Sequence, residues 1–163
     1  MKSPADEALV KIVFELPEGS PYGAESLWAA KVAEGKYRLG NSPLYVYGYS
    51  HKDIVAASEE DGALVVQGLC LRGGHSTYRV FLAEGLEVDS PDFETHWSRL
   101  EQLGCTYEGA GKRLLAIDVP PSADIFAVYR FLEKGEKAGV WEFEEGHCGH
   151  PTSRDNLATA SDS

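Results

Sequence analysis

The chain has 163 residues, of which 43% are hydrophobic and 25% charged, so it can form one globular core or two small lobes. This composition excludes a chain that is disordered along its whole length. With 15 Lys and Arg against 26 Asp and Glu, the formal net charge is −11. Such a surface repels phosphate backbones and anionic lipids, so we expect neither nucleic acid nor a membrane as a partner.

The sequence predicts a cytoplasmic protein. Its first seven residues turn acidic before any apolar run, unlike a secretory signal, and no segment approaches the roughly 18 apolar residues of a membrane span. The cysteines Cys70, Cys105 and Cys148 are odd in number and far apart, which fits neither a disulfide framework nor a closely spaced zinc site. We therefore expect reduced thiols, no cofactor and no bound metal.

Short strands are predicted throughout the first half of the chain. Apolar residues alternate over residues 10–16, as in a strand with one buried face. Gly-, Pro- and acid-rich turns separate this segment from five further predicted strands, at residues 24–32, 36–39, 44–47, 53–57 and 63–71. About six strands without a helix predict a small antiparallel β-barrel-like lobe.

Strand and helix patterns alternate in the second half. Strands are predicted at residues 76–82, 105–108, 113–119 and 140–145. One amphipathic helix is predicted to begin at Pro91, with Ser90 as its cap, and a second near Ser122. The order βαββαβ is the ferredoxin-like plan. The predicted fold class is therefore α+β, with a β-barrel-like lobe followed by a ferredoxin-like lobe.

Four segments are predicted along the chain: a flexible N-terminus at residues 1–8, a β-rich lobe at 9–74, a ferredoxin-like lobe at 75–146 and a disordered tail at 147–163. Residues 83–146 hold 14 acidic and 6 basic side chains, a net charge of −8. We expect this lobe to dock a basic protein, in the manner of an inhibitor or immunity protein. The alternative is that its acidic residues only keep the protein soluble.

The densest polar cluster lies where the two lobes are predicted to meet and contains His75, Ser76, Thr77 and Arg79. On a strand, His75, Thr77 and Arg79 point to one face, so His75 and Arg79 could hold one anionic or carbonyl group. Five polar or amphipathic residues of the first lobe are candidates to join them: Glu25, Trp28, Asn41, Ser50 and Asp53.

Structural roles are the alternative for all nine residues. Arg79 would then pair with a carboxylate of the acidic lobe, and His75 would cap a strand end. The five residues of the first lobe would serve turns, local backbone hydrogen bonds and packing.

Two other clusters are weaker candidates for a functional site. The segment His147-Cys148-Gly149-His150 offers soft ligands, but it is short, lies in the predicted tail and fits adventitious metal binding. Glu142, Glu144 and Glu145 resemble an acid pair or a cation site, but they also fit a solvated strand edge, which we expect.

Four stretches of the chain resemble a bacterial family known as domain of unknown function 4265. They are Glu25-Ser26-Leu27-Trp28-Ala29, Tyr37-Arg38-Leu39-Gly40-Asn41-Ser42-Pro43, Gly74-His75-Ser76-Thr77-Tyr78-Arg79-Val80 and Trp141-Glu142-Phe143-Glu144-Glu145-Gly146. The resemblance runs from about residue 10 to residue 146. It implies a bacterial cytosolic protein, and the family offers no established activity, cofactor or catalytic residue to carry over.

The sequence favours a non-enzymatic module that binds an unknown protein or a small anionic ligand. No complete catalytic pattern, such as Gly-x-Ser-x-Gly, is present. The alternative is a small-molecule hydrolase or transferase in which His75 acts as acid or base and Arg79 holds the substrate's charge.

Overall fold

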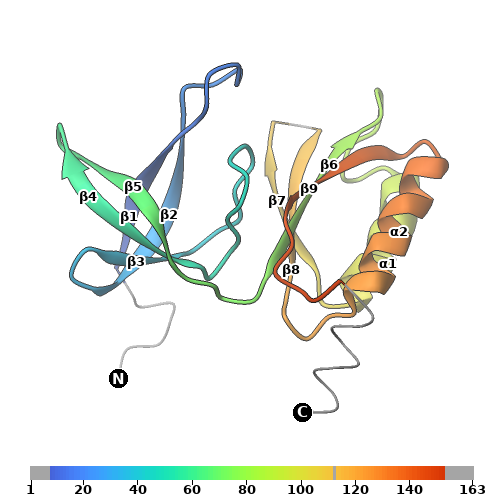
Figure 1. The fold of residues 1–163 in the computed structure, drawn as a ribbon. Helices are drawn as coiled ribbons and strands as arrows, with labels where there is room; N and C mark the ends of the chain where they lie inside the picture. The colour runs from blue at the N-terminus through green and yellow to red at the C-terminus, as the bar shows by residue number, and fades with distance from the viewer. Residues whose placement is uncertain (1–7, 112, 153–163) are drawn as a thin grey trace, which may run out of the picture.

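A computed structural model describes residues 8–111 and 113–152. It contains two sheets of mostly antiparallel strands and two helices, so the α+β class is confirmed. The first half of the chain forms one sheet and the second half forms the other (Figure 1). Both helices cover the face of the second sheet that is turned away from the first sheet, as Figure 1 shows. The opposite face of the second sheet is therefore the one that can meet the first lobe.

The first sheet has five strands: β1 (Leu9–Glu15), β2 (Ala24–Ala33), β3 (Lys36–Leu39), β4 (Ile54–Glu60) and β5 (Ala63–Leu71). Consecutive strands pair antiparallel, and β1 also pairs with β5 in parallel. The prediction of purely antiparallel pairing is wrong for that pair. In five strands of alternating direction, the first and the last run the same way.

The strand predicted at residues 44–47 is absent, and residues 40–53 form a loop instead, which we name the 40–53 loop. The N–H groups of Leu44, Tyr45 and Val46 donate to the Glu25 carboxylate on β2 rather than to a neighbouring strand. Val46 is still buried in the core of the first lobe, which explains the apolar pattern that predicted a strand.

The second sheet has four strands: β6 (Ser76–Leu82), β7 (Thr106–Ala110), β8 (Leu114–Val119) and β9 (Trp141–His147). Their order is β7-β8-β6-β9, and every neighbouring pair is antiparallel. The tail predicted from residue 147 thus begins inside β9, and residues 153–163 of that prediction lie outside the described residues, as do residues 1–7 of the predicted flexible N-terminus.

The helices are α1 (Pro91–Gln102) and α2 (Ile125–Lys137). The first helix begins at Pro91 with Ser90 at its N-cap, as predicted, but the Ser90 Oγ accepts the N–H of Glu87 and makes no hydrogen bond to the helix. The second helix begins later than residue 122, because Asp124 accepts the N–H groups of Phe126 and Ala127 and so caps it. Both helices pack their apolar faces on the second sheet.

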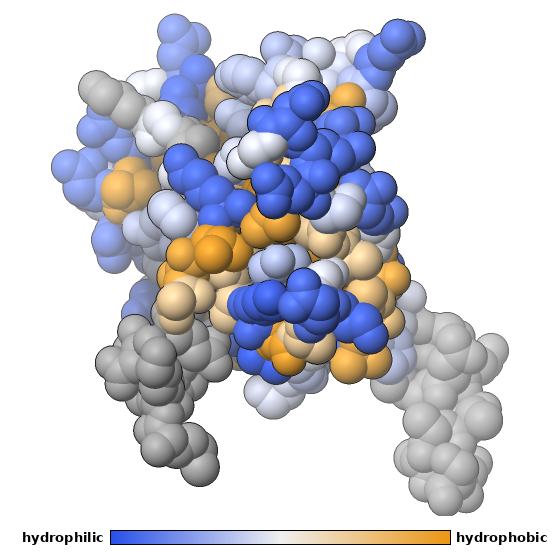
Figure 2. Space-filling model, turned by 90° about the vertical axis from the view of Figure 1, so that its left-hand side faces the viewer, coloured by the Kyte–Doolittle hydropathy of each residue, from blue (hydrophilic) through white to orange (hydrophobic). Residues whose placement is uncertain are grey.

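The outer face of the first lobe carries hydrophobic side chains in its middle, with hydrophilic residues above and below (Figure 2). Its large exposed apolar and aromatic residues include Trp28, Leu69 and Leu71. Among the residues that the structure describes, no helix is both long and apolar enough to cross a membrane.

Candidate functional site

The 40–53 loop joins the two lobes, because it lies against the helix-free face of the second sheet. The Ser42 N–H donates to Glu108 on β7 at 2.7 Å, and the Gly48 N–H donates to the Gly146 carbonyl on β9 at 2.9 Å. Gly146 has no side chain, which leaves room for Arg79 of β6: a Cβ at residue 146 would stand 3.1 Å from Arg79 Nη1. The polar residues predicted at the lobe boundary thus meet a loop that is already anchored to the sheet.

Arg79 is the centre of this junction and is 2% exposed. Its Nε donates to Glu144 Oε1 at 2.8 Å, and its Nη1 donates to the Val46 carbonyl at 2.9 Å. The guanidinium lies 4.5 Å from the centre of the Tyr47 ring, and the Tyr47 hydroxyl donates to the other Glu144 oxygen. The pairing of Arg79 with a carboxylate of the acidic lobe, which was one alternative from the sequence, is therefore present.

Thr77 and Ser50 meet across the junction, with 2.6 Å between their hydroxyl oxygens, and neither is exposed. Asp53 is equally buried and accepts the N–H groups of Ser50 and Gly73, while Arg72 pairs with it at 3.1 Å. One carboxylate therefore connects the turn at residues 50–53 to the segment that enters β6.

The other residues proposed from the first lobe do not reach this cluster. Glu25 is 8% exposed, and its carboxylate accepts three N–H groups of the 40–53 loop. Asn41 accepts the Trp28 N–H, and the Trp28 side chain is 47% exposed beneath the Lys11 ammonium, 5.5 Å from the ring centre. These residues hold the loop on the first sheet.

His75 pairs with a residue that sequence reasoning did not single out. Its Nδ1 lies 2.9 Å from Asp118 Oδ1, and His51 Nδ1 lies 3.7 Å from Asp118 Oδ2. Asp118 faces Thr77 across the β6–β8 ladder, so it shares the helix-free face of the sheet. Alternation along 113–119 would have put Asp118 on the polar face of its strand, but no local pattern brings His51 to it.

Cys105 is a free, buried cysteine in the core between the second sheet and the helices. Burial, followed by the Asp118 charge, raises the pKa of Cys105 to about 12. A thiol with this pKa is protonated near neutral pH and is a poor nucleophile.

Ser76 points the other way, toward the helices, and pairs with His150. Its Oγ lies 2.6 Å from His150 Nδ1 and accepts the Gly149 N–H at 2.8 Å, while His150 Nε2 donates to the Pro120 carbonyl. This is the hydrogen-bond pattern of a serine activated by a base. Ser76 is fully buried, however, so a substrate has no access to its hydroxyl. The role of the pair is structural, because its hydrogen bonds hold residues 149–150 on the sheet.

His147 is the last residue of β9 and pairs with Thr77 of β6. Its Nε2 is buried and has no hydrogen-bond partner among the described residues. Burial, together with the positive charge of Arg72, lowers the pKa of His147 below its ordinary value of 6.5. The neutral imidazole is thus the form that the fold accommodates.

We expect the free energy of unfolding to fall as the pH drops below about 6.5, because the unfolded chain then binds a proton that folded His147 resists. In His147→Gln this contribution is absent, so its stability should change less between pH 8 and pH 5. Urea unfolding at both pH values measures the difference. Equal losses in the two proteins would contradict the assignment.

The helix-free face of the second sheet is open beyond the 40–53 loop. Phe81 on β6 is 45% exposed and lies opposite Glu142 on β9 and Leu114 on β8. A cavity of about 830 Å³ begins here and extends around β9 to α2, and a neighbouring one of about 310 Å³ leads back to Arg79. These cavities, rather than the predicted residues, are the hollow part of this face.

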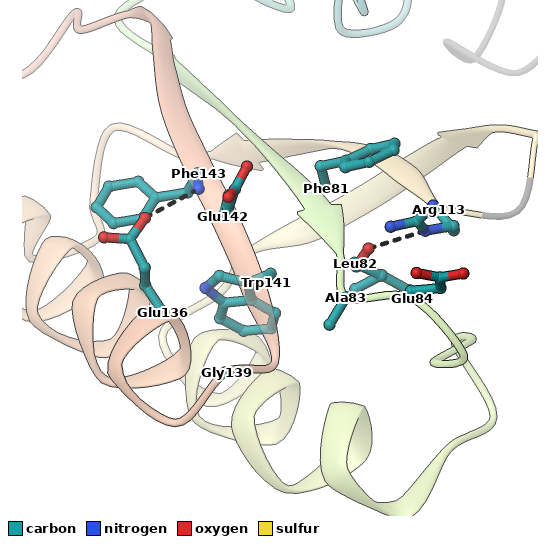
Figure 3. Close-up of a pocket in the computed structure, with 10 residues that line it drawn as sticks. All are labelled: Phe81, Leu82, Ala83, Glu84, Arg113, Glu136, Gly139, Trp141, Glu142 and Phe143. Atoms are coloured by element: carbon teal, nitrogen blue, oxygen red, sulfur yellow. Dashed lines mark hydrogen bonds between the residues drawn. The ribbon is translucent and has the colours of Figure 1, made fainter.

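We name the larger cavity the β9 groove (Figure 3). Carboxylates and aromatic rings dominate its lining: Phe81, Glu84, Glu136, Trp141, Glu142 and Phe143. Its one cation among the described residues, Arg113, lies 4.3 Å from the centre of the Phe81 ring and donates from Nε to the Leu82 carbonyl at 2.9 Å. Figure 3 shows Arg113 beside Phe81 and Glu84, with Glu142 on the opposite strand.

Residues 25–143 match the model of a family described as a domain of unknown function (DUF4265). Among solved structures, the chain is similar to the crystal structure of a hypothetical protein from Neisseria gonorrhoeae. The two share 20% sequence identity with a TM-score of 0.71, over 87% of this chain and 96% of that one, which shows the fold alone. No curated protein matches the chain.

Proposed function

We propose that this chain, which belongs to the DUF4265 family, is a non-enzymatic protein-binding module whose β9 groove receives a basic segment of a partner. One observation carries the proposal. The groove combines three carboxylates, from Glu84, Glu136 and Glu142, with the exposed ring of Phe81, and Arg113, its one cation among the described residues, already donates to a backbone carbonyl.

Charge supports a basic partner. Apart from Phe81 and Leu82, the residues that line the groove belong to the segment 83–146, whose net charge is −8. The long-range field of this segment attracts cations toward the groove. Glu84 and Glu142 are exposed and have no ion pair among the described residues. They remain available to an incoming lysine or arginine.

The aromatic rings support recognition of a guanidinium in particular. A cation over a ring face gains about 0.5–1 kcal/mol at an exposed site and more where water is excluded. Arg113 over Phe81 is an example of this contact within the groove itself. Trp141 and Phe143 add further rings to the lining, and Phe143 lies on the side of β9 that faces α2, where it packs against Tyr129.

The double variant Glu84→Lys/Glu142→Lys tests the proposal. The probe is a fluorescent peptide in which arginine alternates with small apolar residues, and stopped-flow mixing gives its association rate constant. We expect a roughly tenfold slower association at low ionic strength and a flatter salt dependence.

The matched control is Glu18→Lys/Glu59→Lys, which changes the net charge equally on the first lobe, where both residues are exposed. It should slow association much less. Equal slowing by the two double variants would mean that net charge alone attracts the peptide, and would contradict binding in the β9 groove.

A second candidate function is a hydrolase or transferase that uses His75. The observation in its favour is the contact between His75 Nδ1 and Asp118, which orients an imidazole as in a general acid–base pair. Arg79, the expected charge clamp, supports it less, because its Nε and Nη1 already donate to Glu144 and Val46, and its remaining nitrogen, Nη2, is buried and has no partner among the described residues.

For the two lobes, we propose a small barrel-like arrangement of β1–β5 over about residues 9–74 and a ferredoxin-like arrangement over about 75–146. The pairing of β1 with both β2 and β5 supports the first. The order β7-β8-β6-β9, with one helix after β6 and one after β8, supports the second.

A further inference from the structure

We propose that His51, His75 and Asp118 form a binding site for a divalent transition metal ion such as Zn²⁺ at the junction of the two lobes. The three residues come from separate segments: the 40–53 loop, the connection immediately before β6 and the end of β8. One ligand atom from each lies within 4.8 Å of the other two. Two imidazoles and a carboxylate are a ligand set that transition metals accept in proteins.

The distances between these ligand atoms suit a shared ion. Ligands that each stand about 2.1 Å from Zn²⁺ lie roughly 3.4 Å from one another in a tetrahedral site. His75 Nδ1 lies 2.9 and 3.1 Å from the two Asp118 oxygens, and His51 Nδ1 lies 3.7 Å from the nearer one. The ion would take the place of the hydrogen now between His75 and Asp118. All three ligand atoms already lie within 4.8 Å of one another, so shifts of about 1 Å bring them to a shared ion.

Partial burial supports the same conclusion. The side chains of His51, His75 and Asp118 are 24%, 15% and 13% exposed, so an ion could enter from solvent and lose most of its water. The two rings meet edge to face at 5.4 Å, and both turn their Nδ1 atoms to the one carboxylate. Three protein ligands leave a fourth position open to water or to another ligand.

Asp53 positions both histidines although it is not one of the proposed ligands. Its carboxylate accepts the N–H groups of Ser50, next to His51, and of Gly73, two residues before His75. Between them, Lys52 adopts a positive φ of 73° and packs closely on Gly73, where any Cβ would lie within 3.0 Å of Lys52. The loop conformation is therefore constrained to present His51 toward β6 and β8.

Titration of the full chain, freed of metal by a chelator, with ZnCl₂ in a calorimeter tests the site. We expect one ion per chain and a rise in Tm on binding. His51→Ala, His75→Ala and Asp118→Asn should each weaken binding at least about 100-fold, the upper end of what loss of a supporting residue costs. Co²⁺ should give visible ligand-field bands without a thiolate charge-transfer band.

The controls are His96→Ala, on α1, and Cys148→Ser, in the His147-Cys148-Gly149-His150 segment; both should bind Zn²⁺ as the parent does. Circular dichroism checks that each variant folds. If His75→Ala fails to fold, His51→Ala still tests the site, because His51 is the most exposed of the three ligands. No stoichiometric binding by the parent chain, undiminished binding by His51→Ala, or loss of binding in Cys148→Ser would overturn the site.

Discussion

Arg79→Ala should lower the free energy of unfolding by about 3 kcal/mol. The change removes donors to Glu144 and to the Val46 carbonyl and takes the cation from the face of the Tyr47 ring. Breaking a buried ion pair costs about 3–5 kcal/mol, and the lower end applies because the Glu144 side chain is 49% exposed and regains water. Urea unfolding measures the loss.

Arg113→Ala is the matched control for this variant. Arg113 also stacks on a ring and donates to a backbone carbonyl, but it forms no ion pair with a carboxylate of the described residues and lies at the surface of the groove. Its replacement should cost about 1 kcal/mol or less. If Arg79→Ala were no more harmful than Arg113→Ala, the junction would not depend on Arg79.

Gly135→Ala should also destabilise the fold by about 3 kcal/mol, although alanine is the better helix former. A Cβ at position 135 would approach three atoms of the Trp141 indole to less than 3.0 Å. The indole cannot move away easily, because its Nε1–H donates to the Leu132 carbonyl at 2.9 Å and the ring is buried. Crowding a well-packed core in this way costs about 1–3 kcal/mol or more.

Gly68→Ala on β5 provides the comparison, since a Cβ there meets nothing within 4 Å and the backbone needs no positive φ. Its stability should stay within about 0.5 kcal/mol of the parent. A similar urea midpoint for the two alanine variants would contradict the packing of Trp141 on Gly135.

Periodicity predicted most of the fold because one face of each element is buried. The alternation in β1 and the spacing of Phe93, Trp97 and Leu100 in α1 both match the structure. The error at residues 44–47 has a physical cause: an apolar residue such as Val46 fills the core equally well from a loop. What removed the strand was the Glu25 carboxylate, 19 residues or more away in the chain, which binds the amide groups.

The candidate sites were harder to predict because their residues meet only in three dimensions. The sequence placed Thr77 and Arg79 on one face of β6 and Tyr78 and Val80 on the other, and the burial of Tyr78 and Val80 in the helix-side core agrees. It did not reveal that the 40–53 loop covers that first face. Whether the nine residues proposed from the sequence bind a partner stays a prediction. Asp118 reaches His75 through the β6–β8 pairing, and His51 reaches both through the turn that Asp53 holds, so no local pattern shows the three residues together.

Chemical-shift mapping of the full chain with the arginine-containing peptide tests the central claim most directly. We predict that the amide signals that move are those around the β9 groove, at residues 81–84, 113–114 and 136–144, and that the shifts fade as salt is added. The signals of residues 41–53 and 75–77 should stay in place. Shifts confined to those junction residues, with the groove unchanged, would contradict the account and return the binding site to the lobe junction.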